Sequence, residues 1–178
     1  MADASWIAKL RQGDQRAFER LLEQYREPIF RLAYRIVGPA DADDAAQEAF
    51  IKIYRGLPTF RGGSQLNTWL YRVALNACYE YRRRRKVVEL PLLAPVEVDK
   101  DDDPEKTAME NLLWARIEEA LDKMDEKHRE ALILHELQGL TYGEAAKVIG
   151  VPVGTVKSRL HYAFQELRRI LQEMGVEA

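Results

Sequence analysis

The chain of 178 residues contains almost no cysteine, since Cys78 is the only one. A single thiol excludes a disulfide within the chain, and His128, His135 and His161 do not combine with it in the spacing of a metal site. No uninterrupted apolar run reaches membrane-spanning length, and the N-terminus lacks the basic region and long apolar core of a signal peptide. We therefore expect a cytoplasmic protein without a metal ion or other cofactor.

The chain also lacks the excess of basic residues that is typical of proteins that bind nucleic acid, because its net charge is −2. The charges are nevertheless sorted along the sequence. Lys and Arg exceed Asp and Glu by six in residues 1–86, whereas acidic residues are in excess by five in residues 87–107 and by three in residues 108–178. Because nonspecific affinity for DNA rises with the number of phosphates neutralised, an acidic C-terminal part that binds DNA needs a second tether.

The stretch from Thr141 to Leu171 has the pattern of two helices that meet at a sharp turn. Thr141 and Glu144 have the spacing of a capping box, which begins a helix by satisfying free backbone donors. Gly150 can adopt the left-handed conformation that commonly ends a helix, and Pro152 suits the start of the next one. These signals predict a helix-turn-helix, a motif that places its second helix in the major groove of DNA.

The second of these helices has two different sides. Its apolar residues recur at three- and four-residue steps and predict a buried stripe of Val153, Val156, Leu160, Ala163, Leu167 and Ile170. The other side carries short hydroxyls, cations and an aromatic ring, on Thr155, Lys157, Ser158, Arg159 and Tyr162. Such groups hydrogen-bond to phosphates and base edges, so we interpret them as a DNA-reading face. The alternative is an amphipathic helical hairpin whose outer side only meets water.

The N-terminal part has a helical pattern throughout. Asp14 is the expected cap of a long helix, Asp41 caps a second one, and a third runs from about Leu66 into the basic run of residues 82–86. The first of these helices is expected to bury Phe18, Leu21, Leu22, Tyr25, Ile29, Leu32 and Ile36. No strand pattern competes with these helices.

The composition changes in residues 87–106, which contain three prolines, a cluster of acidic residues and little periodicity. We interpret this stretch as an acidic flexible linker. Thr107 and Glu110 then repeat the spacing of a capping box and begin a new helix. The predicted fold is therefore all-α, with two small helical domains in residues 1–86 and 107–178.

Two surfaces of the N-terminal domain are candidates for binding. Asp44, Gln47 and Glu48 lie along one exposed helix side and would attract a basic partner, although a solvated helix face has the same pattern. The following segment interleaves arginines with the aromatic residues Phe60, Trp69, Tyr71, Tyr79 and Tyr81. Aromatic rings can stack on unpaired bases while cations follow the backbone of single-stranded DNA. Packing in the core is the alternative for these rings.

Three segments, DADDAAQEAF, FRGGSQLNTWLYRVALN and LTYGEAAKVIGVPVGTVKSRL, resemble regions two and four of bacterial extracytoplasmic-function sigma factors of the sigma-70 family. They occur in the family's order and span nearly the whole chain. The resemblance implies a dissociable initiation subunit that directs core RNA polymerase to promoters and leaves catalysis to the polymerase. It also implies control by an anti-sigma factor.

The resemblance further implies a role for each part of the chain. Region two would bind the clamp helices of core polymerase through Asp44, Gln47, Glu48 and Phe50. It would recognise and melt the downstream promoter element through Arg61, Gly62, Gly63, Ser64, Gln65, Leu66, Asn67, Thr68, Trp69 and Arg72. Region four would contact the polymerase flap and read the upstream element of the duplex through Thr155, Lys157, Ser158, Arg159 and Tyr162. The linker would thread toward the active centre and the RNA exit path.

The chain departs from the family pattern at four positions. Many relatives have an acidic residue at the position of Gly63, an aromatic one at Leu66, and arginines at Tyr162 and Phe164, so the promoter sequence does not follow from the family. Two other functions fit part of the pattern. One is a conventional helix-turn-helix regulator that binds duplex DNA without polymerase, and the other is a helical adaptor or signalling scaffold.

Overall fold

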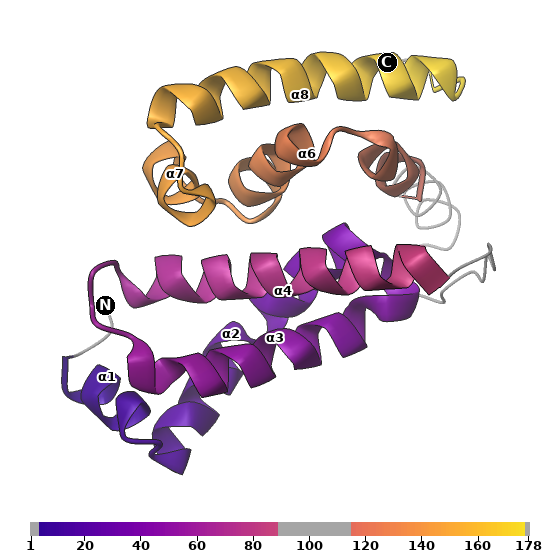
Figure 1. The fold of residues 1–178 in the computed structure, drawn as a ribbon. Coiled ribbons are helices and arrows are strands. Elements are labelled where there is room, and N and C mark those ends of the chain that lie inside the picture. Colours follow the sequence, from indigo (N-terminus) through magenta and orange to yellow (C-terminus); the bar gives the residue numbers. More distant parts are fainter. Residues whose placement is uncertain (1–3, 89–114, 177–178) are drawn as a thin grey trace, which may run out of the picture. The chain divides into compact units, whose positions relative to one another are not determined.

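The computed structural model describes residues 4–88 and 115–176, and the chain divides into two compact units, Met1–Leu92 and Leu93–Ala178. The described residues form helices and turns and contain no strand, which confirms the predicted all-α fold (Figure 1). The predicted linker, residues 87–106, lies outside the described residues apart from its first two, which continue a helix. Within the described ranges, no helix combines the length and the apolar character needed to cross a bilayer.

The N-terminal unit is a bundle of three long helices with a short one at its start (Figure 1). Its helices are α1 (Ala4–Arg11), α2 (Gln15–Val37), α3 (Ala42–Gly56) and α4 (Leu66–Val88). Short 3-10 turns, η1 (Pro39–Asp41) and η2 (Leu57–Thr59), flank α3. Each of the three long helices packs against the other two, so residues far apart in sequence meet in one core.

Helix α2 begins as predicted, because the Asp14 carboxylate accepts a hydrogen bond from the Ala17 backbone N–H at 2.7 Å. Of the seven residues that the periodicity placed inside, Leu21, Ile29, Leu32 and Ile36 are buried. The other three, Phe18, Leu22 and Tyr25, are only half-buried. The predicted inner stripe of α2 was therefore too wide.

Asp41 does not cap α3 in the predicted way. It occupies the N-cap position but makes no side-chain capping hydrogen bond. Its carboxylate instead accepts from the Tyr81 hydroxyl at 3.1 Å and from Arg85 Nη2 at 2.7 Å, both on α4. A charge-assisted contact from a neighbouring helix is stronger than a neutral backbone donor, and only the tertiary fold brings it near.

The C-terminal unit contains shorter helices and one long one. Residues 115–123 are helical, and α6 (Glu126–Leu132), the π-helical turn η3 (Ile133–Leu137), α7 (Tyr142–Ile149) and α8 (Val153–Glu173) follow. Helix α8 packs against both α6 and α7. The pair α7 and α8 is the predicted helix-turn-helix.

The turn signals of this motif act as expected. The Glu144 backbone N–H donates to Thr141 Oγ1 at 3.3 Å, and Glu144 Oε2 accepts from the Thr141 backbone N–H at 2.9 Å. Gly150 ends α7 in the left-handed conformation, with φ +82°. Four residues of the predicted stripe on α8 are buried, namely Val156, Leu160, Ala163 and Ile170. Val153 at the start of α8 is exposed, and Leu167 is half-buried, so these two predictions were wrong.

Candidate nucleic-acid interface

Helix α8 carries the polar face that the sequence predicts. Lys157, Ser158 and Tyr162 are exposed, and Thr155 is half-buried near the start of the helix. The Lys157 ammonium lies 5.5 Å from the centroid of the Tyr142 ring on α7, which orients a flexible cation against the first helix of the motif. The Ser158 hydroxyl donates to the Thr155 carbonyl at 3.0 Å and keeps its lone pairs for an outside donor.

Arg159 is less accessible than its place on this face implies. Its side chain is only 18% exposed, and Nη1 lies 3.4 Å from Oε2 of Glu130 on α6, whose side chain is also 18% exposed. Burial raises the pKa of Glu130 to about 7, although the Arg159 charge acts to lower it. The sequence gives no signal for Glu130, because this residue lies 29 residues from Arg159 in a helix without a DNA-binding pattern.

Tyr162 is also supported from α6. Its ring is 55% exposed and stacks on the His128 ring, with the centroids 6.1 Å apart. His128 Nδ1 lies 2.6 Å from Glu166 Oε2 on α8, and Glu166 Oε1 accepts from the Asp125 backbone N–H at 2.9 Å. Two side chains of α6, Glu130 and His128, therefore contact two residues of the predicted DNA-reading face, Arg159 and Tyr162.

The residues predicted to bind the downstream element lie in the loop after η2 and in the first turns of α4. The exposed ones are Arg61, Gly62, Gly63, Gln65 and Arg72. Gly62 has φ +74°, a conformation that residues with a side chain rarely adopt. Ser64 and Asn67 are half-buried, whereas Leu66 and Thr68 are buried and lie on the inner side. The last two shape the loop and do not present their side chains to a ligand.

Trp69 is half-buried and is held by two neighbours. A Cβ atom added to Gly56 at the end of α3 would lie 2.9 Å from Trp69 Cζ2, so the ring packs directly on the glycine backbone. The Phe60 ring also packs near the indole, with the ring centroids 5.3 Å apart. The indole is thus fixed by packing, and part of it stays accessible beside the exposed loop.

The other aromatic rings of this segment belong to the core. Phe60, Tyr71, Tyr79 and Tyr81 are all less than 9% exposed, so the prediction that they stack on bases is not supported by their positions. Burial, together with the acceptor Asp41, raises the pKa of Tyr81 to about 12. Among the five predicted rings, Trp69 is the one with substantial accessible surface.

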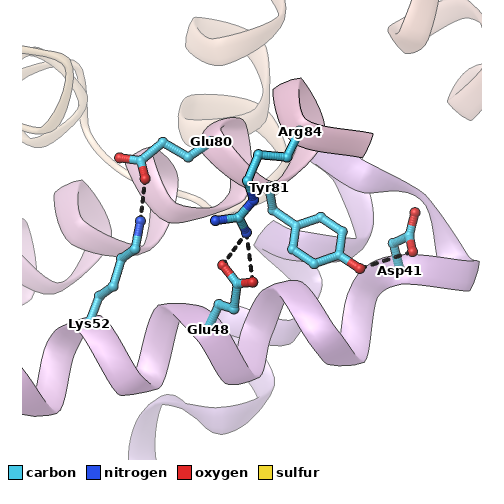
Figure 2. Close-up of polar contacts among 6 residues, drawn as sticks. All are labelled: Asp41, Glu48, Lys52, Glu80, Tyr81 and Arg84. Atoms are coloured by element: carbon cyan, nitrogen blue, oxygen red, sulfur yellow. Dashed lines mark hydrogen bonds and ion pairs between the residues drawn. The ribbon is translucent and has the colours of Figure 1, made fainter. Parts of the chain in front are cut away.

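Charged side chains of α3 pair with charged side chains of α4, as Figure 2 shows. Arg84 Nη2 lies 2.6 and 2.5 Å from the two carboxylate oxygens of Glu48, and Lys52 pairs with Glu80. The sequence pattern had indicated two separate binding surfaces, one on each helix. Because the helices lie side by side, Glu48 is instead occupied within the unit.

An open groove of about 940 Å³ runs between α2 and α3. Its apolar lining is Leu22, Phe30, Ala46 and Phe50, and its polar lining is Glu23, Arg26, Glu27, Asp43 and Gln47. Two residues predicted to bind polymerase, Gln47 and Phe50, meet here, and Asp44 is exposed on the same helix. An apolar groove with several carboxylates fits a partner helix with apolar and basic side chains.

Comparisons with known proteins agree with this arrangement. Residues 21–87 match the family model of Sigma-70 region 2, and residues 114–167 match that of Sigma-70, region 4. The RNA polymerase sigma-H factor of Pseudomonas aeruginosa is 37% identical, over 99% of this chain and 97% of that protein. The ECF RNA polymerase sigma-E factor of Escherichia coli K12 is 32% identical, over 98% and 96%. A structure of CnrH in complex with the cytosolic domain of CnrY matches with a TM-score of 0.74 and 26% identity, over 97% of this chain and 99% of CnrH.

Proposed function

The chain belongs to the extracytoplasmic-function sigma factors of the sigma-70 family, and we propose that its two units divide promoter recognition between them. Proteins of this family are transcription initiation factors of RNA polymerase. In our proposal the N-terminal unit binds core polymerase and opens the downstream element, while the C-terminal unit selects the upstream element. The chain performs no covalent chemistry itself and acts in the cytoplasm.

The upstream element is read by α8 in the major groove. Lys157, Ser158 and Tyr162 project from one exposed side of this helix and supply a cation, a small hydroxyl and an aromatic phenol. Arg159 contributes the guanidinium that is best suited to a guanine edge. The acidic character of the C-terminal segment keeps its independent affinity for DNA low, so binding depends on the polymerase as a tether.

The downstream element is opened by the loop before α4. Gly62 and Gly63 carry no side chain that would keep a nucleotide away from the backbone. Trp69 offers an accessible aromatic surface for an unpaired base, and Arg61 and Arg72 provide exposed cations for the phosphates. Capture of the single strand after melting favours the open state.

Core polymerase binds at the groove between α2 and α3. Phe50 supplies apolar surface and Gln47 an exposed amide in the groove, and Asp44 supplies an exposed carboxylate on the same helix. Glu48 contributes less than the sequence analysis expected, because Arg84 holds its carboxylate. The CnrH structure, determined in complex with the cytosolic domain of CnrY, supports a further protein partner for this chain. The sequence resemblance implies that this partner is an anti-sigma factor.

The observation that carries this proposal is the presence of both sigma-70 regions, in order, in a chain that aligns with whole sigma factors. The direct test is transcription by core polymerase on a promoter library, with and without the purified chain. We expect transcription from a small set of promoters only when the chain is present, and permanganate footprinting should detect unpaired thymines at the downstream element.

The same experiment separates the alternatives. A conventional helix-turn-helix regulator would shift duplex DNA in the absence of polymerase, and a helical adaptor would change neither transcription nor DNA mobility. If the chain neither associates with core polymerase nor changes promoter selection at any salt concentration, the proposal is wrong.

A further inference from the structure

Promoter recognition by α8 does not explain why Arg159 pairs with Glu130 of the neighbouring helix α6. An arginine offered to DNA is expected to extend into solvent, yet Arg159 leans against α6. We propose that Glu130 is a positioning residue for the upstream element, which holds Arg159 so that one edge of its guanidinium meets the DNA and thereby selects the base position that Arg159 reads. This inference rests on the proposed function.

The geometry of the pair supports an orienting role. A guanidinium carries five N–H donors in a rigid planar fork. Glu130 Oε2 faces Nη1 of Arg159 at 3.4 Å, which leaves the donors on Nε and Nη2 for a partner outside the unit. A bidentate contact to guanine needs two donors in a defined plane, so a side chain that fixes this plane also fixes which base is recognised.

Because both side chains are largely shielded from solvent, the pair can keep the Arg159 guanidinium in one orientation. Each side chain retains only 18% of its accessible surface. Water and salt screen the attraction within such a pair much less than within an exposed one. The two side chains also have fewer alternative rotamers. Glu130 lies on α6 and Arg159 on α8, and these two helices pack against each other. The orientation of the guanidinium therefore depends on how the two helices pack.

A carboxylate at position 130 does not serve the stability of the fold at neutral pH. Burial raises its pKa from an ordinary 4.5 to about 7, and this effect outweighs the attraction of Arg159. A group with a raised pKa in the folded state stabilises the fold fully below about pH 4.5, and this contribution is lost as the pH rises through about 7. The ionised carboxylate therefore costs stability at neutral pH, where it nevertheless faces the cation.

Few other charges act on this carboxylate. Among the described residues, the groups that influence the Glu130 pKa besides burial are Arg159 from α8, which lowers it, and Glu126 from one turn earlier on α6, which raises it. The nearby His128 is turned toward Glu166 and Tyr162. Arg159 is thus the cation whose position responds to the charge of Glu130, and Glu126 provides a matched control on the same helix.

The test compares upstream-element selectivity of full-length variants bound to core polymerase. Competition binding is measured on promoters that carry each single-base substitution in the upstream element, at about pH 8 and about pH 6. The variants are Glu130→Gln, Glu130→Asp, Glu126→Gln, Arg159→Ala and the double change of Glu130→Gln with Arg159→Ala. Thermal unfolding of each variant confirms that the C-terminal unit is folded.

We expect Glu130→Gln to reduce discrimination at pH 8 by about 3- to 10-fold at the positions that Arg159→Ala affects, and nowhere else. The double variant should be no less selective than Arg159→Ala alone, and Glu126→Gln should keep the wild-type profile at pH 8, where Glu130 is ionised in both proteins. Lowering the pH to 6 protonates Glu130, so the wild-type profile should then approach that of Glu130→Gln, whose own profile should not change. If Glu130→Gln does not fold, this pH profile of the wild type and the Glu130→Asp variant carry the test.

Three results would overturn the inference. The first is an unchanged profile in Glu130→Gln, the second a uniform loss at all positions, and the third an equal loss in the Arg159→Ala background. If the wild-type chain directs polymerase to promoters and one of these three results is obtained, only the positioning role of Glu130 is contradicted. A wild-type chain that fails to direct polymerase to any promoter contradicts the proposed function, and the positioning role with it.

Discussion

The two units pair arginines with carboxylates of a neighbouring helix in different ways. In the N-terminal unit, Arg84 on α4 is 56% exposed and pairs with Glu48 on α3, which is 35% exposed. In the C-terminal unit, Arg159 is only 18% exposed against Glu130. Exposed pairs are screened and exchange readily with outside partners, whereas a shielded pair keeps its geometry. The N-terminal unit can therefore rearrange its charged side chains when a partner binds, whereas the C-terminal unit holds the Arg159 guanidinium in place before binding.

The largest expected effect tests whether the two units unfold separately. Leu70 on α4 and Leu134 in η3 are both fully buried, so replacing either by alanine should destabilise its own unit by about 2–5 kcal/mol. Hydrogen exchange resolved along the chain measures this directly. Leu70→Ala should accelerate exchange in residues 4–88 and leave residues 115–176 unchanged, with the reverse for Leu134→Ala. Equal acceleration in both units would show one cooperative body and remove the basis of the comparison.

The next effect concerns strand capture by the N-terminal unit. Trp69→Ala removes the accessible indole and should weaken open-complex formation by about 1–3 kcal/mol, the usual loss for one base–aromatic stack. Binding to the closed promoter should change much less. A premelted template should restore activity to Trp69→Ala, and Trp69→Phe should retain part of the activity on duplex DNA. If premelting restores nothing, the ring serves mainly to pack on Gly56 and Phe60.

A comparable effect is expected for the shielded cation of the C-terminal unit. Arg159→Ala should cost about 1–3 kcal/mol of promoter affinity, concentrated at one position of the upstream element. Competition with single-base promoter variants measures this. Arg168→Ala is the matched control, because Arg168 is an exposed arginine on the same helix outside the proposed reading face. A uniform loss over all sequences would assign Arg159 to a phosphate contact.

The smallest effects distinguish exposed from paired residues on α3. Combined alanine substitution of Asp44 and Gln47 should weaken binding to core polymerase by about 5- to 10-fold, because both side chains are exposed on α3 and Gln47 lines the groove. Glu48→Gln should change the affinity by less than about 2-fold, since its partner is Arg84 in the same unit. Equilibrium binding of labelled protein to core polymerase compares the two. A stronger effect of Glu48→Gln would mean that polymerase displaces Arg84.

Local signals in the sequence predicted most helix boundaries correctly. Asp14 caps α2, the capping box of Thr141 and Glu144 begins α7, and Gly150 ends it, because each of these interactions spans only a few residues of one chain segment. Asp41 shows the limit of this approach. Its capping role was predicted from position alone, but two donors on α4 take its carboxylate.

Side-chain exposure was harder to predict than helix position. The aromatic residues Tyr71, Tyr79 and Tyr81 have the sequence pattern of a stacking surface, yet they are buried, because α4 packs against both α2 and α3 and leaves little of its circumference exposed. Leu22 has the pattern of a core residue but lines the open groove. Periodicity shows that residues share a face and not which neighbour covers it.

The amino-acid sequence alone determined the family, the all-α class and the position of the helix-turn-helix, because short-range spacing and motif order carry that information. The pairing of Glu48 with Arg84, the packing of Trp69 on Gly56, and the contact between Glu130 and Arg159 arise from the folded arrangement. Each joins residues on different helices, at distances and exposures set by helix packing. These contacts decide which side chains of the motifs are paired within a unit and which are exposed.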